Sequence, residues 1–223
     1  MKVAALLSGG KDSVYAAWIA MQQGWEVTHF VTLQPANPSS YMFHHPNVGL
    51  ARLQAKAAGI PHRMVLTSGV KEAELVDLKR ALSGLEADGV VSGAIASEYQ
   101  KERVDFTCAE LGLKSFAPLW HKNQELLARE EAEALDAIIV SVSAEGLGRE
   151  WLGRKYDSKC VDDLVRLNKR LGVSVCGEGG EFETLVLNAP FFKKRLEIKK
   201  SEAKWAGTSG TFNVISASLS AIP

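Results

Sequence analysis

Two glycines, a lysine, an acid and two serines follow directly on an apolar run near the start of the chain, in the string SGGKDS. Glycines let successive backbone N–H groups converge, and the N-terminus of a following helix adds partial positive charge, so this string predicts a phosphate-binding loop. Lys11 brings a mobile positive charge, and Asp12 can cap the helix or help to hold Mg²⁺. The alternative is an ordinary helix cap with a tight turn. The candidate phosphate ligands are Ser8, Gly9, Gly10, Lys11, Asp12 and Ser13.

The string SGAIASEYQKERVDFTCAELGL contains a second candidate surface at the start of an expected helix. Ser97, followed three positions later by Gln100, fits a capping box. Val104 lies on an apolar stripe that we assign to the core, whereas Tyr99 and Arg103 lie on another stripe. An aromatic ring, an amide and a guanidinium in the first two turns would face a ligand crevice. The alternative is a solvated helix start with an ordinary cap.

The third candidate is EGGEFET, residues 178–184, where three carboxylates fall within six positions. If the segment after the glycine turn is a strand, Glu181 and Glu183 share one face of it, with Glu178 before the turn. Convergent carboxylates suit a metal, an ammonium group or a cationic substrate, and they can tune one another as an acid/base pair. The alternative is a charged hairpin tip.

These residues need a scaffold that brings them together, and the apolar pattern of the first half predicts one. Apolar strand-like runs alternate with stretches at helical spacing, which predicts parallel strands joined by helical crossovers. Such open sheets bind ligands beyond the carboxyl ends of their strands, so segments 8–13, 33–47 and 92–103 are expected to meet. The expected strands are 3–7, 25–33, 62–67 and a short one within 84–95; the expected helices are one that ends at Gly24, 50–58, 71–82 and 97–111.

The pattern changes from about residue 125. The expected elements there are a helix over 125–135, a strand over 136–144, a helix over 157–171, two strands around a glycine turn within 173–190, and a two-stranded antiparallel tail over 195–219. We therefore predict an α/β fold: a Rossmann-like parallel sheet with helices on both faces, plus a smaller α+β C-terminal domain. The predicted domains are residues 1–124 and 125–223.

Composition narrows the class of protein. The 223 residues carry no net charge, so no basic excess indicates nucleic acid as a partner. No apolar run is long enough for a transmembrane helix, and the apolar start is too short for a signal peptide, so no membrane partner is expected. Three well-separated cysteines without a CxxC spacing favour a reducing, cytoplasmic location and argue against a structural zinc site.

SGGKDS lacks the Walker A spacing but resembles the PP-loop of the N-type ATP pyrophosphatases. That superfamily implies adenylation, in which pyrophosphate leaves from ATP and a nucleophile later displaces AMP. Together with the helix-start string, a following LW and EGGEFET, the chain resembles the diphthine–ammonia ligase (diphthamide synthase) family. The similarity runs across nearly the whole chain, including SYMFHHPN, and EGGEFET is its most particular string.

The resemblance implies that diphthine, a modified histidine of translation elongation factor 2, becomes diphthamide with ATP, Mg²⁺ and ammonium as co-reactants. Diphthine ends in a carboxylate, which needs activation before amide formation, and carries a quaternary ammonium that glutamates or the faces of Phe182 and Tyr99 could hold. The chain looks like the short archaeal form, which would use free ammonia or an unknown donor. The sequence leaves the oligomeric state open, with a homodimer as one alternative.

The resemblance also implies residue roles. Leu33 and Gly93 join residues 8–13 around the nucleotide, and Asp12 is the candidate Mg²⁺ ligand. The candidate catalytic residues are Lys11, Asp12 and Glu183; the candidate substrate ligands are Tyr99, Gln100, Arg103, Glu178, Gly179, Gly180, Glu181, Glu183 and Thr184. No general base can be named.

Two other functions remain open. A tRNA-thiolating or lysidine-forming PP-loop enzyme would need a basic RNA surface, and the thiolating types often use paired catalytic cysteines; neither feature is visible here. A nucleotide-binding sensor would share the fold without catalysis, but the lysine, aspartate and glutamate cluster argues against it.

Overall fold

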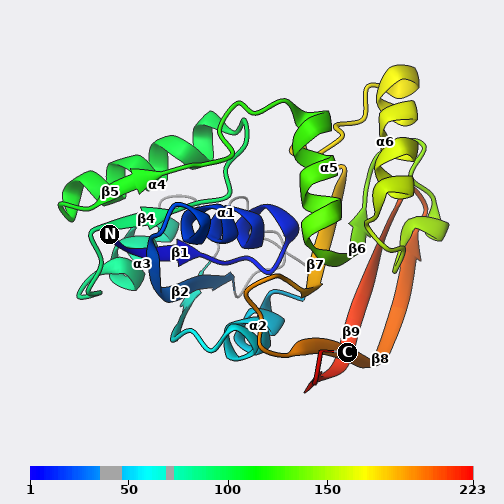
Figure 1. Ribbon diagram of the computed structural model, residues 1–223. Coiled ribbons are helices and arrows are strands. Elements are labelled where there is room, and N and C mark those ends of the chain that lie inside the picture. Colours follow the sequence, from blue (N-terminus) through cyan, green and yellow to red (C-terminus); the bar gives the residue numbers. More distant parts are fainter. Residues whose placement is uncertain (36–46, 69–72, 223) are drawn as a thin grey trace.

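The first half of the chain builds a five-stranded parallel sheet in the order β3-β2-β1-β4-β5 (Figure 1). The computed structural model describes residues 1–35, 47–68 and 73–222. The strands are β1 (Lys2–Leu6), β2 (Glu26–Pro35), β3 (His62–Thr67), β4 (Gly89–Val91) and β5 (Lys114–Phe116). The strand order reverses at β1, which therefore lies between β2 and β4, the position where open sheets of this kind bind ligands.

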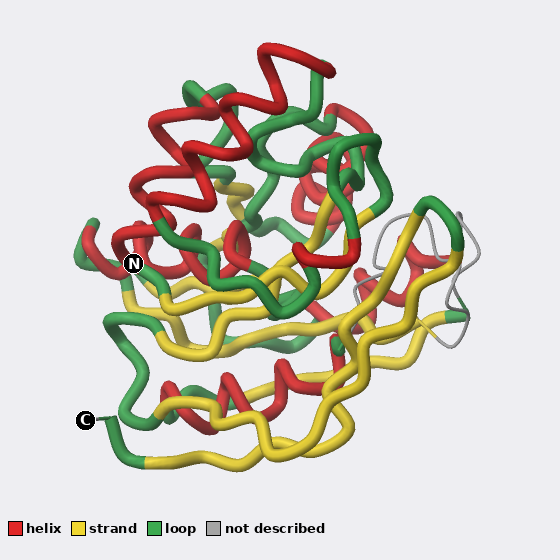
Figure 2. The backbone as a smooth tube through the Cα atoms, turned by 90° about the vertical axis from the view of Figure 1, so that its right-hand side faces the viewer, coloured by secondary structure: helices red, strands yellow, loops and turns green. Residues whose placement is uncertain are grey.

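Helices cover both faces of this sheet because side chains of β1 alternate between them. Val3 and Ala5 belong to a core shared with α1 (Lys11–Gln22) and α2 (Ala51–Ala58). Ala4 belongs to a second core shared with α3 (Ala73–Leu82) and α4 (Glu98–Glu110). Figure 2, turned by 90°, shows helices on both sides of the strands. The α/β class predicted from the alternation is confirmed.

The second half forms a separate antiparallel sheet in the order β7-β6-β9-β8. Its strands are β6 (Asp136–Val142), β7 (Phe182–Asn188), β8 (Arg195–Ala206) and β9 (Ser209–Ser220), and its helices are α5 (Gln124–Ala134) and α6 (Ser158–Leu171). Short 3-10 helices cover Val48–Leu50 and Arg149–Trp151. The long β8–β9 hairpin, orange to red in Figure 1, stands apart from the parallel sheet.

The two halves share one continuous core rather than meeting through a thin linker. The core on the α1 face of the parallel sheet continues into buried residues of α5, β6 and α6, including Leu127, Ile139 and Leu164. Aromatic rings cross the junction as well: Phe191, which follows β7, lies 6.1 Å from the ring of Trp18 and 6.2 Å from that of Phe30. The C-terminal half therefore packs directly against α1 and the parallel sheet. The boundary between residues 124 and 125 stays a prediction.

Two local expectations differ from the structure. The strand expected over 173–176 is wrong: this segment is irregular, because its polar groups bond to side chains rather than to a neighbouring strand. Ser174 donates its N–H to Glu181, and the carbonyl of Cys176 accepts from Lys11. The short strand β5 was not expected. Histidines of the string SYMFHHPN lie outside the described residues.

No helix in the described part of the chain is both long and apolar enough to cross a membrane.

Replacing Phe30 by alanine is expected to lower the free energy of unfolding by about 3–5 kcal/mol, because its ring lies fully inside the core. Phe106→Ala is the matched control: that ring is 58% exposed on α4, and its loss should cost less than about 1 kcal/mol. Urea unfolding of both variants measures the difference. Equal losses would contradict this description of the core.

Candidate active site

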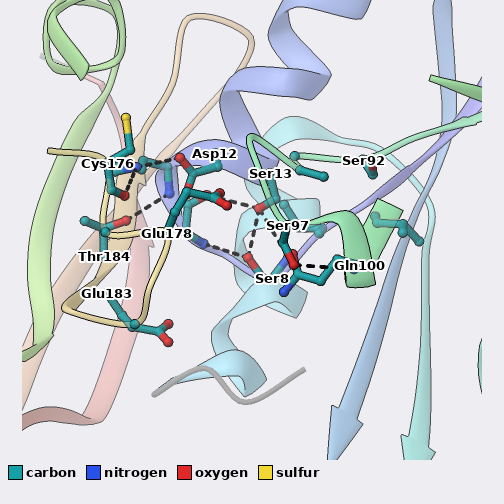
Figure 3. Close-up of a pocket in the computed structure, with 18 of the residues that line it drawn as sticks. Ser8, Asp12, Ser13, Ser92, Ser97, Gln100, Cys176, Glu178, Glu183 and Thr184 are labelled. Carbon is teal, nitrogen blue, oxygen red and sulfur yellow. Dashed lines mark hydrogen bonds and ion pairs between the residues drawn. The ribbon is translucent and has the colours of Figure 1, made fainter. Parts of the chain in front are cut away.

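A cavity of about 460 Å³ opens at the carboxyl edge of the parallel sheet (Figure 3). Each of the three segments expected to meet there contributes described residues to its lining. These are the loop after β1, Leu33 in β2, and six residues between Ser92 and Gln100 after β4. The fourth wall comes from the C-terminal half, through Cys176–Gly180 and the start of β7. The volume is in the range of pockets that bind small molecules.

The loop after β1 places backbone donors and hydroxyls at the start of α1. Gly9 has φ +93°, a conformation that other residues rarely adopt, and a Cβ there would lie 3.0 Å from the Gln54 side chain. The hydroxyls of Ser8 and Ser13 lie 3.1 Å apart and line the cavity. The first-turn N–H groups of Asp12 and Ser13 have no partner within the helix, which suits an anion.

Strand β7 and helix α2 hold this loop from behind. The carbonyl oxygen of Gly9 accepts from the N–H of Val186 at 3.0 Å and from Gln54 Nε2 at 2.9 Å. Gln54 Nε2 also donates to the carbonyl of Val186 at 2.8 Å. The N–H of Lys11 donates to Thr184 Oγ1 at 3.0 Å, so the predicted substrate ligand Thr184 contacts the loop itself. Gln54 was missed from sequence; its signal is a polar residue on the alanine-rich face of α2.

Lys11 was expected to act as a mobile charge, but its side chain is buried. Its ammonium lies 2.5 Å from Asp12 Oδ1, 3.2 Å from Glu131 Oε2 and 2.9 Å from the Cys176 carbonyl. Burial works to lower the pKa of this ammonium, but Asp12 and Glu131 outweigh it and hold the pKa well above the ordinary value. The positive charge is therefore fixed beneath the loop in this conformation.

Glu131, on α5, is the second residue that sequence reasoning missed. It is fully buried, and burial raises the pKa of its carboxyl well above the usual value, with Lys11 acting in the opposite direction. Its sequence signal is its place four residues after the buried Leu127, on the apolar face of the helix. An acid at such a position needs a buried partner, which only the fold supplies.

Gly93 brings the end of β4 against the start of α1. A Cβ at this position would lie 2.7 Å from both the carbonyl carbon of Asp12 and the nitrogen of Ser13. No side chain fits in that space, so this glycine allows the loops after β1 and β4 to form one wall of the cavity.

Glu178 links the C-terminal half to the loop after β4. Its carboxylate accepts from the N–H of Ala96 at 3.2 Å and lines the cavity next to Asp12 (Figure 3). Burial, and then the charge of Asp12, raise the pKa of Glu178 above its usual value, while the Ala96 N–H acts in the opposite direction. Two neighbouring acids thus face one space, which favours a cation between them.

The other two glutamates do not act as the predicted pair. Glu181 precedes β7 and turns back on its own loop, accepting from the N–H groups of Ser174 at 3.1 Å and Gly179 at 2.8 Å. It lies outside the described lining of the cavity, because these backbone donors hold its carboxylate. Glu183 does line the cavity, with Gly179 and Gly180, and projects away from Glu178 in Figure 3.

The helix-start residues are only partly brought together. Ser97 Oγ accepts from the N–H of Gln100, as the capping box predicts, and Tyr99 and Gln100 line the cavity. Arg103 lies outside the described lining: its guanidinium stacks 3.4 Å from the centroid of the Tyr99 ring. The Lys11 ammonium similarly lies 5.9 Å from the ring of Phe182. The rings of Phe182 and Tyr99 were expected to hold a substrate cation. In the structure a cationic side chain of this chain already lies over each of them.

Mg²⁺ fits this donor set. Among the described residues no group of three histidines, cysteines or acids could hold a metal by itself. Magnesium often binds through one or two carboxylates together with substrate phosphates. Asp12, partly exposed beside the loop, supplies such a carboxylate.

Family models cover both halves of the chain. The model described as "Diphthamide synthase N-terminal domain" matches residues 1–115, and "Diphthamide synthase C-terminal domain" matches residues 123–219. The chain belongs to the diphthamide synthase family. The family that the sequence resembles is confirmed.

The curated relatives of this chain are named diphthine–ammonia ligases. A diphthine–ammonia ligase of Rattus norvegicus is 36% identical over 91% of this chain and 85% of its own length. One of Schizosaccharomyces pombe is 35% identical over 91% of this chain but only 37% of its own length. Among solved structures, a predicted subunit of tRNA methyltransferase from Methanocaldococcus jannaschii aligns over 85% of this chain and 98% of its own, with 17% identity and a TM-score of 0.49, which is too slight to bear on function. Diphthine–ammonia ligases form a C–N bond, so this family is one of enzymes.

Gln54→Leu is expected to lower the free energy of unfolding by about 1–3 kcal/mol, because two buried carbonyls lose a donor while the side-chain volume hardly changes. Urea unfolding measures this loss. Gln22→Leu, on the exposed end of α1, is the control and should leave stability nearly unchanged. A Gln54 variant as stable as the parent would mean that these two bonds do not hold the loop.

Proposed function

We propose that this chain amidates diphthine on translation elongation factor 2 with ATP and ammonia, forming diphthamide, AMP and pyrophosphate. One observation carries the proposal: a single cavity is lined both by the glycine loop after β1 and by Glu178, Gly179 and Gly180 of the C-terminal half. A nucleotide bound at the loop would therefore react within reach of the segment most particular to this family.

In the proposed reaction a carboxylate oxygen of diphthine attacks the α-phosphorus of ATP, and the bond to the β-phosphate oxygen breaks to release pyrophosphate. Ammonia then attacks the acyl carbon, AMP leaves, and one proton is lost. The serine hydroxyls and first-turn N–H groups of α1 would cradle the departing phosphates, next to Leu33 and Gly93. Mg²⁺, held by Asp12, would neutralise charge on the phosphates.

We infer that the acceptor approaches from a second hollow of about 820 Å³ in the C-terminal half. It is lined by β6, by the tip of the β8–β9 hairpin, and by Gly180 and Glu183, which also line the first cavity. Trp205 lies in its wall. Since Lys11 and Arg103 already lie over the rings of Phe182 and Tyr99, Trp205, which lines the same hollow as Glu183, is the better candidate to receive a quaternary ammonium.

The thiolating alternative is disfavoured by the state of the cysteines. All three are buried and free. Burial raises the pKa of Cys108 to about 11, and those of Cys160 and Cys176 to about 12, so they are thiols rather than reactive thiolates at neutral pH. The cytoplasmic location, the use of free ammonium and a homodimer stay predictions.

The test is product analysis with ATP, ammonium and elongation factor 2 that carries diphthine. We expect AMP and pyrophosphate in equal amounts and a mass decrease of about one dalton on the factor, because an amide nitrogen with its hydrogens replaces the carboxyl OH. ADP and phosphate would exclude adenylation. Bound ATP without turnover would favour the sensor.

Glu183→Ala should leave the ATP dissociation constant nearly unchanged but lower acceptor-dependent AMP formation on the order of 100-fold, because the residue lies where the two hollows join. Calorimetric ATP titration and AMP assays separate the two effects. Glu145→Ala, an exposed acid before α6, should behave like the parent. A loss of ATP affinity in the Glu183 variant would contradict this division of roles between the halves.

A further inference from the structure

Three ionisable side chains from two distant parts of the chain form a row behind the phosphate-binding loop, and the two at the back of the row are buried. Glu131 of α5 contacts the Lys11 ammonium at 3.2 Å, and the ammonium contacts Asp12 at 2.5 Å. The carbonyl of Cys176, just before the EGG string, accepts from the same ammonium at 2.9 Å. One ammonium therefore joins α5, the loop after β1 and the segment before Glu178.

Exposure increases along this row toward the cavity. The side chains of Glu131 and Lys11 are 0% and 2% exposed, whereas that of Asp12 is 31% exposed and lines the cavity. Glu131 thus contacts the back of Lys11, and only Asp12 can meet a ligand directly. The rings of Tyr156 and Phe182, at 5.7 and 5.9 Å from the ammonium, close the space around it.

The burial of this ammonium decides between two roles for Lys11. To bind a phosphate, the ammonium would have to leave Asp12, Glu131 and the Cys176 carbonyl together, and a carboxyl of Glu131 would stay buried without its cation. Leaving a buried charged partner uncompensated is strongly unfavourable. The role that keeps every contact is to hold the Asp12 carboxylate in place.

We propose that Glu131 is a positioning residue of the ATP site: from α5 it fixes the Lys11 ammonium beneath the loop, and Lys11 in turn orients the Asp12 carboxylate toward the cavity. The inference rests on the proposed binding of ATP with Mg²⁺ at this loop. Groups that orient a metal ligand from behind affect metal affinity without touching the metal.

Direct ATP binding, measured by calorimetry with and without Mg²⁺, tests this proposal. Glu131→Leu removes the carboxyl group that pairs with Lys11. The gain in ATP affinity that Mg²⁺ provides should therefore fall about tenfold, the smaller of the effects typical of residues that hold a metal ligand from behind. ATP affinity without Mg²⁺ should stay within about twofold, because the loop's backbone donors and hydroxyls remain.

Two further variants set the expected pattern. Glu131→Gln keeps an oxygen that can accept from Lys11, so this variant should retain most of the Mg²⁺ effect. If Glu131 only filled space, the leucine and glutamine variants should behave alike. Glu133→Leu, on the exposed side of the same helix, should leave the Mg²⁺ effect unchanged. Thermal unfolding of each variant shows whether the protein is folded at the temperature of the titration.

The double variant Lys11→Met/Glu131→Leu keeps the test decisive if the single leucine variant does not fold. Apolar chains of similar size often replace a buried ion pair without loss of stability. Its Mg²⁺ effect should be reduced as in Glu131→Leu, with ATP affinity in the absence of Mg²⁺ preserved.

The outcomes separate this inference from the proposed function. An unchanged Mg²⁺ effect in a folded Glu131→Leu protein overturns the positioning role, whatever the enzyme's reaction. Loss of ATP affinity without Mg²⁺ in the double variant would show that Lys11 binds phosphate, and would overturn it as well. If the parent protein binds ATP with Mg²⁺ but does not amidate the factor, the proposed reaction is wrong. The positioning role of Glu131 is then still decided by these titrations. A parent that binds no ATP overturns both.

Discussion

The geometry of the site depends on the hydrogen bonds that the carbonyl oxygen of Gly9 accepts. This oxygen accepts hydrogen bonds from Val186 of β7 and from Gln54 of α2, so a tight glycine turn of the first half is held by an antiparallel strand of the second. A loop with φ +93° at Gly9 costs conformational entropy to order. These bonds order it before a ligand arrives, which is what a preorganised anion site requires.

The same junction explains why the chain uses two sheets. The parallel sheet brings the segments after β1, β2 and β4 to one edge, but the cavity there has a further wall that these segments do not form. The C-terminal half supplies that wall through the start of β7 and through Cys176–Gly180. Behind the wall, Glu131 of α5 pairs with the buried Lys11 ammonium. Because Gly180 and Glu183 of the C-terminal half line both hollows, molecules bound in the two hollows would meet at this segment.

Much of this arrangement could be predicted from local patterns. The apolar run before SGGKDS and the helical spacing after it give β1 and α1 to within about two residues, and the alternation gives a parallel sheet. Strand β5 carries little local signal, since its three residues KSF become a strand only by pairing with β4. The segment VSVC has the alternation of a strand, yet its polar groups bond to Lys11 and Glu181 instead.

The side-chain contacts of the site were harder to predict because partners come from distant parts of the chain. The strings SGGKDS and EGGEFET predict which loops meet. They do not predict that Lys11 is buried or that Glu181 turns back on its own loop. Gln54 and Glu131 are polar residues on apolar helix faces, a pattern that predicts a buried partner without identifying it. Only the contact between the halves shows which groups they meet.

Amide hydrogen exchange with and without Mg²⁺ and ATP tests the central claim, that the glycine loop and β7 form one site, most directly. The readout is the exchange rate of the Val186 N–H, which bonds to Gly9, and of the Lys11 N–H, which bonds to Thr184. Since each bond joins the loop to β7, ligand binding at the loop should slow both rates together. Protection of the loop with no change across Phe182–Asn188 would contradict the claim.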